Sequence, residues 1–377
     1  MDFFDRLFAG DKSFFDIPIT EQKKYLEKLG EATNDYDRSY KQYRGQAFYM
    51  SREKRILLAV MSFLLSIFLT NYYIIRGMFL KFHGDVDAIS RASESVQFIP
   101  LSLLQKYNVN RTLWNTKGAI HIKDIPFVLG LAVRYFLHPF FYIKILFKVA
   151  KYSALIYQYH PRAIIVNDEF SFTGSLLTLF CERHHVKHID VQHGEKLFFL
   201  RDSFFRFHEC FIWDEHYRQL FISLKAEPSQ FVIELPESMR FDIKKHFSKD
   251  LYADFKYYLG LYNEEELVSV IEAMKSLRNK GYTIKYRPHP NYSDRDLLKK
   301  YVSVDEIESP DVNILESISS TKNVVGVYST VLTQAYFNGQ QVVIDDIAFK
   351  NQYNALRDLG YILIDKVKNR LSDYQTA

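Results

Sequence analysis

The chain has 377 residues, a length that accommodates two domains of ordinary size, each with its own hydrophobic core. Hydrophobic residues make up 47% of the sequence and charged residues 25%, which excludes an intrinsically disordered protein. The net charge of +4 is too small to indicate general binding of nucleic acid, so we expect no nucleic-acid partner.

The cysteines and the N-terminus indicate a reducing compartment. Cys181 and Cys210 stand in apolar surroundings without CxxC spacing, which favours buried thiols over a disulfide framework or a zinc site. Residues 1–6 carry acidic side chains where a signal peptide has a basic region, and no long apolar core follows them. We therefore expect no cleavable signal and a cytoplasmic location.

Two segments of the N-terminal half are strongly apolar. After a predicted surface helix at residues 21–31, residues 56–69 form a run of fourteen without charge. A transmembrane helix needs about 20 apolar residues, and Asn71 and Arg76 follow closely, so a buried helix is the favoured prediction. Residues 127–159 are aromatic and basic, which is typical either of a long domain helix or of a segment in a membrane interface. Peripheral attachment to the inner leaflet stays open.

From residue 163 strands and helices alternate, which predicts a parallel α/β sheet. Strands are predicted at 163–166, 186–191 and 209–213, and helices at 171–183 and 216–225. The alternation resumes after a connection rich in Lys and Asp, with strands at 255–261, 282–286, 324–327 and 341–344 and helices at 264–280, 315–319 and 331–338. We therefore predict an N-terminal domain at 1–235, a linker at 236–254 and a C-terminal domain at 255–377. The last helix of the chain either stays with the C-terminal domain or crosses back to the N-terminal domain.

The helix after the first strand of the second domain has clear end signals. Asn263 and Glu266 have the spacing of a capping box, and Gly281 is placed to end the helix. The strand that follows leads into Arg287-Pro288-His289-Pro290, where two prolines fix the backbone around an imidazole.

Ser329-Thr330 stands at another junction of strand and helix, where hydroxyl groups and free N–H groups suit an anion. Taken singly, His289 is also explained by an ordinary surface loop, and Ser329 by a helix N-cap. Ligands of open α/β sheets bind at the carboxyl ends of the strands, where both motifs lie. Together they predict a site for an anion.

These motifs resemble those of a known family. Pro288-His289-Pro290 and the stretch from Tyr328 to Gly339 are similar to the HP and Ser-Ser/Thr motifs of bacterial GT-B sialyltransferases and polysialyltransferases. The similarity covers residues 255–347, and the N-terminal half only in outline. It implies a GT-B fold, in which two Rossmann-like domains with parallel sheets face a cleft. It further implies a CMP-activated donor bound through its phosphate and nucleoside by Arg287, His289, Pro290, Glu316, Ser329 and Thr330.

Two motifs of the N-terminal half extend the resemblance. Asn167-Asp168-Glu169-Phe170 occupies the place of that family's acidic motif, with Phe170 where the family has Gly. Gln192-His193-Gly194 is similar to the His-Gly motif of CDP-glycerol glycerophosphotransferases and of capsule Kdo transferases. The resemblance implies a catalytic base among Asp168, Glu169 and His193, and an acceptor side formed by Gln192, Glu195 and Asp214. A capping carboxylate and a buried structural histidine are the respective alternatives.

The function that this implies is an inverting glycosyltransferase of bacterial surface-glycan synthesis. It would move a nonulosonic acid from its CMP ester to a glycan or glycolipid acceptor. Transfer of Kdo from CMP-Kdo or of glycerol phosphate from CDP-glycerol is the alternative within the class, and a non-catalytic membrane-associated protein of polysaccharide assembly is the alternative outside it. Asp345-Asp346 invites a metal, but a phosphate held by His289 and a helix N-terminus needs none, so we expect no metal and no cofactor.

Overall fold

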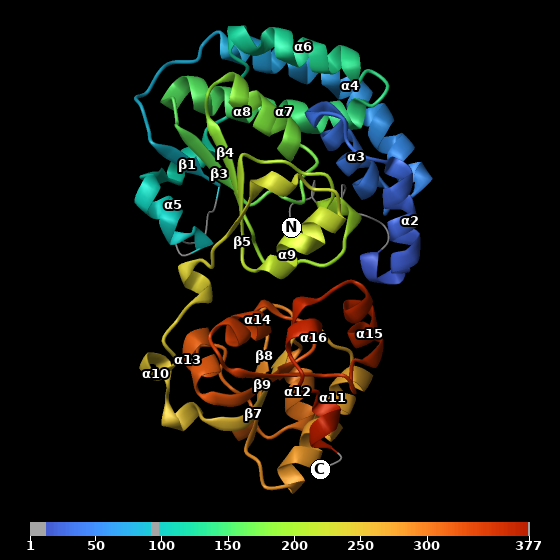
Figure 1. Ribbon diagram of the computed structural model, residues 1–377, viewed down its shortest axis with the longest axis vertical. Coiled ribbons are helices and arrows are strands. Elements are labelled where there is room, and N and C mark those ends of the chain that lie inside the picture. The colour runs from blue at the N-terminus through green and yellow to red at the C-terminus, as the bar shows by residue number, and fades with distance from the viewer. Residues whose placement is uncertain (1–12, 92–97, 376–377) are drawn as a thin grey trace. The chain divides into compact units, whose positions relative to one another are not determined.

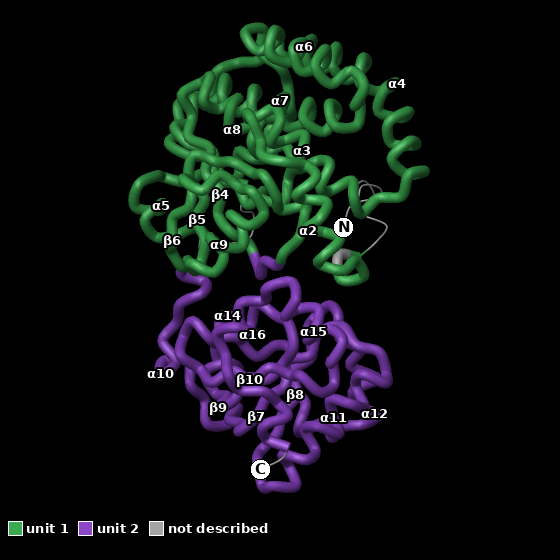
Figure 2. The backbone as a smooth tube through the Cα atoms, turned by 45° about the vertical axis from the view of Figure 1, so that its right-hand side comes forward, with its two compact units in different colours: residues 1–193, 198–236 green, residues 194–197, 237–377 purple. Residues whose placement is uncertain are grey.

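The computed structural model describes residues 13–91 and 98–375 (Figure 1). The chain divides into two compact units, which we call unit 1 (residues 1–193 and 198–236) and unit 2 (residues 194–197 and 237–377) (Figure 2). Each unit contains its own parallel sheet, so the predicted fold class of two Rossmann-like α/β domains is confirmed. The expected absence of a signal rests on residues 1–6, which lie outside the described residues.

Unit 1 is built on a sheet of six parallel strands in the order β2-β1-β3-β4-β5-β6. The strands are β1 (Ala88–Ser90), β2 (Val109–Asn110), β3 (Ala163–Val166), β4 (Lys187–Val191), β5 (Glu209–Ile212) and β6 (Phe231–Ile233). The chain moves from β1 to β2 in one direction and then continues from β3 in the other. The topological switch point of unit 1 therefore lies between β1 and β3.

Both faces of this sheet are covered, as its apolar strands require. On one face Ile165, Ile189 and Phe211 pack in a cluster with residues of α5 (Leu101–Lys106). On the other face His188 bonds to two helices, through Tyr152 of α7 (Pro139–Tyr159) at 2.8 Å and Thr178 of α8 (Gly174–Arg183) at 2.8 Å. The thiols of Cys181 and Cys210 are buried and form no disulfide with each other, as predicted.

Helices α2 (Ile19–Leu29), α3 (Asp35–Ala47), α4 (Arg52–Gly77), α6 (Ile125–Arg134) and α9 (Glu215–Ser223) complete unit 1. The prediction of a buried helix at residues 56–69 is wrong. Helix α4 packs along α7 through buried residues such as Leu58 and Thr70, but Leu64 is 72% and Phe68 67% exposed. It is long and apolar enough to cross a membrane by length and composition. The predicted aromatic segment at 127–159 is in fact two helices, of which α7 is a core helix of the domain.

Unit 2 is built on four parallel strands in the order β10-β9-β7-β8. The strands are β7 (Ala253–Leu259), β8 (Ile284–Pro288), β9 (Thr321–Gly326) and β10 (Gln341–Ile344). The helices are α10 (Ile243–His246), α11 (Glu264–Asn279), α12 (Arg295–Tyr301), α13 (Ile314–Ser319), α14 (Thr330–Phe337), α15 (Lys350–Asp358) and α16 (Ile362–Lys366). The switch point of this sheet lies between β7 and β9.

The end signals of α11 act as predicted. The Asn263 side chain accepts a hydrogen bond from the Glu266 N–H at 2.9 Å, and the Glu266 carboxylate accepts one from the Asn263 N–H at 2.9 Å. Gly281 follows the helix with φ of +90°, a conformation that favours glycine. Between these ends, an apolar face that includes Leu267 and Met274 packs on β7 and β8 in the core of unit 2.

Candidate functional site

Unit 2 contains a cavity of about 390 Å³ at the carboxyl edge of its sheet. The residues that line it follow β7, β8 and β9, together with three from other segments: Tyr257, Tyr258, Leu259, Gly260, Leu261, His289, Tyr292, Val327, Tyr328, Ser329, Thr330, Glu195, Phe349 and Gln352. The cavity therefore lies at the switch point between β7 and β9. The structure brings His289, Ser329 and Thr330, predicted from separate motifs, into one cavity.

The backbone holds His289 in a defined orientation. Its N–H donates to the Leu259 carbonyl at 3.1 Å and to the Ser293 hydroxyl at 2.8 Å. The N–H of Asn291 donates to Nδ1 of the ring at 3.1 Å, so in the neutral imidazole Nε2 carries the hydrogen. Burial lowers the pKa of His289 below its ordinary value, which favours this neutral form. The ring stacks on Tyr292 at 4.4 Å. Nε2 is thus a hydrogen-bond donor on a fixed ring.

Ser329 and Thr330 form the N-terminus of α14. The Ser329 hydroxyl oxygen accepts a hydrogen bond from the Val331 N–H at 3.2 Å, so this serine does cap the helix. Its hydroxyl hydrogen is not used in that bond and is oriented by whatever acceptor is present. Thr330 is exposed at the first helical position. The positive end of the helix dipole therefore lies in the same cavity as the His289 ring.

Arg287, Pro290 and Glu316, which the resemblance places at the nucleotide, are not among the described residues that line this cavity. Arg287 is buried and its guanidinium bonds to the Glu308 carboxylate at 2.5 Å and to the Val312 carbonyl at 2.8 Å. Glu316 is exposed on α13. Contact of these residues with a nucleotide stays a prediction.

Glu308 was not predicted from the sequence as a residue of the site, although its carboxylate binds two buried cations, one from β7 and one from β8. Its carboxylate pairs with Lys256 as well as Arg287, and Lys256 is completely buried. Ser317 donates to the same carboxylate at 2.5 Å, and Tyr258, which lines the cavity, bonds to Ser317 at 2.9 Å. This cluster connects β7 and β8 to the wall of the cavity. No sequence pattern predicts this cluster, because Glu308 lies in an irregular segment far from Lys256 in the chain.

In unit 1, Asp168 is engaged by two cations. Its carboxylate pairs with Arg91, which follows β1, and with Nζ of Lys148 of α7 at 2.8 Å, while its own side chain is only 2% exposed. The Asp168 N–H donates to Asp190 at 2.7 Å. A general base needs an accessible lone pair, and here both carboxylate oxygens are bound by cations. Thr173 is the N-cap residue of α8, so neither Asp168 nor Glu169 caps that helix.

The His193 imidazole is exposed after β4, with its ring 5.9 Å from that of Phe98. Gly194 has φ of +71°, and a Cβ at this position would meet nothing within 4 Å. The backbone conformation, not close packing, therefore explains the glycine. Of the residues predicted on the acceptor side, Gln192 is buried and accepts from the Trp213 N–H at 3.2 Å, and Asp214 caps α9. Glu195 belongs to unit 2 and lines its cavity.

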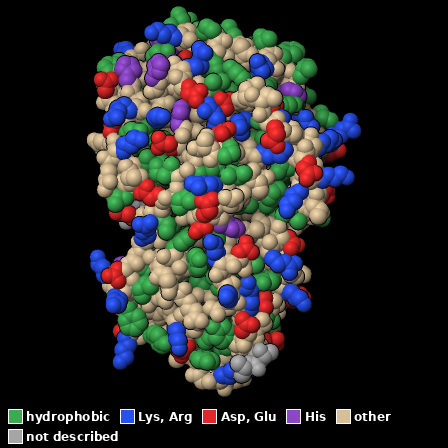
Figure 3. All heavy atoms as spheres, in the orientation of Figure 1, with side chains coloured by type: hydrophobic (Ala, Val, Ile, Leu, Met, Phe, Trp, Pro, Cys, Tyr) green, Lys and Arg blue, Asp and Glu red, His purple; other side chains and the backbone are tan. Residues whose placement is uncertain are grey.

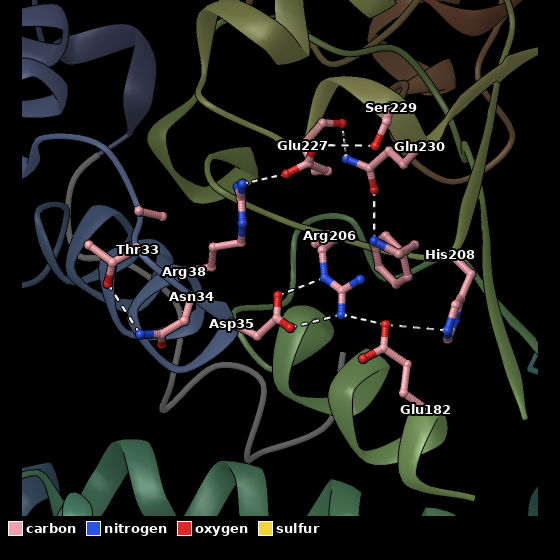
Figure 4. Close-up of a pocket in the computed structure, with 12 residues that line it drawn as sticks. Thr33, Asn34, Asp35, Arg38, Glu182, Arg206, His208, Glu227, Ser229 and Gln230 are labelled. Atoms are coloured by element: carbon pink, nitrogen blue, oxygen red, sulfur yellow. Dashed lines mark hydrogen bonds and ion pairs between the residues drawn. The ribbon is translucent and has the colours of Figure 1, made fainter. Parts of the chain in front are cut away.

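A larger cavity of about 590 Å³ lies in unit 1 around Arg206 (Figure 4). Arg206 binds both oxygens of Asp35 at 2.6 and 2.8 Å and Glu182 at 2.8 Å, and Arg38 binds Glu227 at 2.6 Å. Arg206 precedes β5 and Glu227 precedes β6, so the cavity is at the amino edge of the sheet, opposite the edge at which α/β sheets bind ligands. We interpret it as an ion-pair network that ties α3 to the sheet.

Asp345 and Asp346 anchor the chain after β10. Asp345 accepts hydrogen bonds from the Tyr257 hydroxyl at 2.6 Å and from the N–H groups of Ile347 and Ala348 at 2.9 Å. Asp346 accepts from Ser372. Within residues 13–91 and 98–375, no group of three or more His, Cys, Asp or Glu side chains is arranged to hold a metal ion.

Two Rossmann-like units in one chain, each with a cavity at the carboxyl edge of its own sheet, define the architecture of the GT-B class. No protein-family model and no curated protein matches the sequence.

Among solved structures, UDP-GlcNAc 2-epimerase from Neisseria meningitidis bound to UDP-GlcNAc is similar over 78% of this chain and 90% of its own, with 10% identity and a TM-score of 0.44. A variant of the wall teichoic acid polymerase TagF with CDPG is similar over 60% and 67%, with 12% identity and a TM-score of 0.35. HepE of Anabaena in complex with UDP is similar over 78% and 97%, with 8% identity and a TM-score of 0.37. These similarities are similarities of fold alone.

Proposed function

We propose that the protein is a transferase that uses a nucleotide-activated donor and holds the donor's phosphate in the cavity of unit 2. The observation that carries this proposal is that His289 and the Ser329-Thr330 helix start, from two different strand ends, line one cavity at the switch point. Both supply hydrogen-bond donors, and Glu195 is the one acidic residue among the described residues that line the cavity. Such a combination stabilises a phosphate leaving group as its charge develops.

The remaining lining suits a nucleoside. The volume of about 390 Å³ is in the usual range for small-molecule sites. Five aromatic residues besides His289 contribute to the walls: Tyr257, Tyr258, Tyr292, Tyr328 and Phe349. Aromatic rings offer stacking surfaces to a planar base.

The finer proposal follows the motif resemblance. It is inverting transfer of a nonulosonic acid from its CMP ester to a glycan or glycolipid acceptor in surface-glycan synthesis, without metal or other cofactor. CMP-Kdo and CDP-glycerol are the alternative donors.

We assign the general base to His193 in preference to Asp168 or Glu169. Deprotonation of an acceptor hydroxyl requires a group with a free lone pair, and Asp168 is occupied by Arg91 and Lys148. His193 is exposed, and it is two residues before Glu195, which lines the donor cavity. The covalent chain alone keeps two such Cα atoms within about 7 Å.

The proposal also includes peripheral attachment to the cytoplasmic face of a membrane. The exposed apolar residues of α4 and the basic residues at its start, Arg52, Lys54 and Arg55, support it.

A donor assay tests the proposal. Purified protein is incubated with CMP-sialic acid, CMP-pseudaminic acid, CMP-Kdo and CDP-glycerol, and release of CMP or glycerol phosphate transfer is measured. We expect turnover of one donor in the presence of chelator, and loss of about 100-fold or more in kcat/KM in His289→Ala. The matched control is His246→Ala, in unit 2 but outside the cavity. No turnover with any donor, together with no binding of CMP, would overturn the proposal in favour of a non-catalytic membrane-associated protein.

A further inference from the structure

A second cavity, of about 490 Å³, lies in unit 1 and is rich in cations. Among the described residues that line it, Arg91, Lys144, Lys148 and Arg201 are basic and Asp168 is the one acidic residue. The side chains of Arg91 and Lys148 are 35% and 28% exposed, whereas that of Asp168 is 2% exposed. The Asp168 carboxylate therefore lies beneath Arg91 and Lys148 and holds them. Arg201 pairs with Asp202 at 3.2 Å, and positive charge is still in excess among the four cations and these two carboxylates.

The position of this cavity in the fold is that of a ligand site. Arg91 directly follows β1 and Asp168 follows β3, so the cavity is at the carboxyl edge of the sheet and at its switch point. Burial and the neighbouring cations Arg91, Lys144 and Lys151 lower the pKa of Lys148 to about 7. A further anion would relieve this repulsion between cations.

The other walls of the cavity are apolar. Phe140 and Phe147 of α7, Phe172, and Met50, which precedes α4, contribute to them. Arg201 lies over the ring of Phe170 at 5.1 Å, so even this cation is bordered by an aromatic surface. A small inorganic anion would leave these walls without a partner.

The apolar walls continue onto the outer surface of unit 1. Phe147 is 42% exposed and its ring lies 6.1 Å from that of Tyr73 in α4. Further along α4, Phe63 contacts Phe136, which follows α6, at 5.8 Å. Apolar side chains are visible at the surface in the region of α4 and α6 (Figure 3). Among the residues of α4 and α6 and those directly after α6, Leu64, Phe68, Val133, Phe136 and Leu137 are more than 60% exposed.

We propose that this cationic cavity binds the phosphate group of a lipid, whose apolar chain follows Phe147 toward the exposed surface of α4. This inference rests on the proposed function. In that function the lipid is the anchor of the acceptor that the transferase modifies. Asp168 then acts as a positioning residue that holds Arg91 and Lys148 side by side. Two fixed cations, with Lys144 one turn before Lys148 on the same helix, match the several oxygens of a phosphate or diphosphate group.

Isothermal titration of the full chain with three probes tests the inference. The first probe, n-dodecyl phosphate, carries both an anion and an apolar chain. Inorganic phosphate carries the anion alone, and n-dodecyl maltoside carries the apolar chain alone. We expect n-dodecyl phosphate to bind at least tenfold more tightly than either of the others. Equal affinity for inorganic phosphate would show that the site binds free anions. Equal affinity for the maltoside would show that it is a surface for detergents in general. Either result would overturn the inference.

Variants locate the binding. In Lys144→Gln/Arg201→Gln the affinity for n-dodecyl phosphate should fall at least tenfold. Lys187→Gln is the matched control, because it removes an exposed cation of unit 1 at the amino end of β4. If the double variant fails to fold, the charge reversal Lys144→Glu, at a partly exposed position, replaces it. Unchanged affinity in a folded variant would contradict the assignment.

The same samples separate this inference from the proposed function. Donor turnover depends on His289 in unit 2 and is measured with water as acceptor. Normal donor hydrolysis without binding of n-dodecyl phosphate would overturn the lipid-phosphate site alone. Binding of n-dodecyl phosphate without turnover of any nucleotide would overturn the donor proposal alone.

Discussion

At the scale of single residues, the buried cluster of Lys256, Arg287 and Glu308 shows how unit 2 supports its cavity. Burial raises the pKa of Glu308, but the charge of Lys256 and the hydrogen bonds from Lys256, Ser317 and Arg287 outweigh it, so the pKa is held below its ordinary value of 4.5. The carboxylate therefore stays ionised at neutral pH, and its removal would leave two buried cations without their partner.

We expect Glu308→Ala to lower the free energy of unfolding of unit 2 by about 3–5 kcal/mol, because Lys256 has no access to water. Urea unfolding followed by far-UV circular dichroism measures it. Asp358→Ala is the control, since its pair with Arg357 is about half exposed, and we expect a change within about 0.5 kcal/mol. A small effect of Glu308→Ala, similar to that of the control, would show that the cluster does not stabilise the unit.

The residues of the candidate site differ in how far the sequence revealed them. His289, Ser329 and Thr330 were recognisable because each stands at the end of an apolar run, with prolines or a helix start beside it. Arg91 and Lys148 were not, because a lone cation after a three-residue strand and a lysine within an aromatic helix have no distinctive spacing. Their common partner Asp168 was recognised, but the sequence could not show that its oxygens are already bound.

At the scale of secondary structure, α4 and α7 have similar apolar compositions and opposite environments. Helix α7 is enclosed by the sheet, α8 and α4, whereas α4 contacts the rest of unit 1 along one side. Composition reports how apolar a helix is but not which elements cover it. For this reason the sequence favoured a buried helix at residues 56–69, and for residues 127–159 it left a domain helix and a membrane-interface segment open. Strands β3 and β10 were predicted at their observed bounds, while β1, β2 and β6 are two or three residues long and give no periodic signal.

We expect Leu64→Glu/Phe68→Glu in α4 to abolish binding to vesicles of phosphatidylcholine and phosphatidylglycerol, because two charges would enter the apolar surface. The midpoint of thermal unfolding should change little, since both side chains are more than 60% exposed. Flotation of the vesicles in a density gradient measures binding.

Val304→Glu is the control for this experiment. Val304 is 72% exposed and belongs to unit 2, whereas α4 belongs to unit 1, so its replacement should leave flotation unchanged. Flotation of the α4 variant to the same extent as the unaltered protein would exclude this helix as the membrane-binding surface.

At the scale of the whole molecule, the two units repeat one arrangement. In each, the strand order reverses beside the strand that comes first in the chain, β1 in unit 1 and β7 in unit 2. A cavity lies at the carboxyl edge where the order reverses. The cavity of unit 2 presents neutral hydrogen-bond donors and a helix N-terminus, while that of unit 1 presents an excess of cations and apolar walls. The same backbone rule thus places two cavities of different chemistry, which suits the proposed transferase with two substrates.

The two units also differ in their response to acid. In unit 1, burial lowers the pKa of His121, His138, His188 and His208 below the ordinary value of 6.5. Below pH 6.5 the unfolded chain therefore binds protons that folded unit 1 does not, and the stability of unit 1 falls as the pH decreases, by up to about 1.4 kcal/mol per pH unit for each histidine. In unit 2 burial lowers the pKa of His289 in the same way, so a smaller loss of the same sign is expected there. Glu308 of unit 2 has a lowered pKa, so its contribution is complete above 4.5 and is lost only as the pH falls through its folded-state value.

Tryptophan fluorescence isolates this effect, because both tryptophans, Trp114 and Trp213, lie in unit 1. Between about pH 7.5 and about pH 5.5 we expect the urea midpoint from fluorescence to fall, while a second circular-dichroism transition assigned to unit 2 moves less. His188→Gln removes the histidine that bonds Tyr152 and Thr178, so it should make the dependence on pH shallower even where it lowers stability at neutral pH. A fluorescence midpoint that is constant or rises on acidification would mean that the buried histidines take up protons in the folded unit.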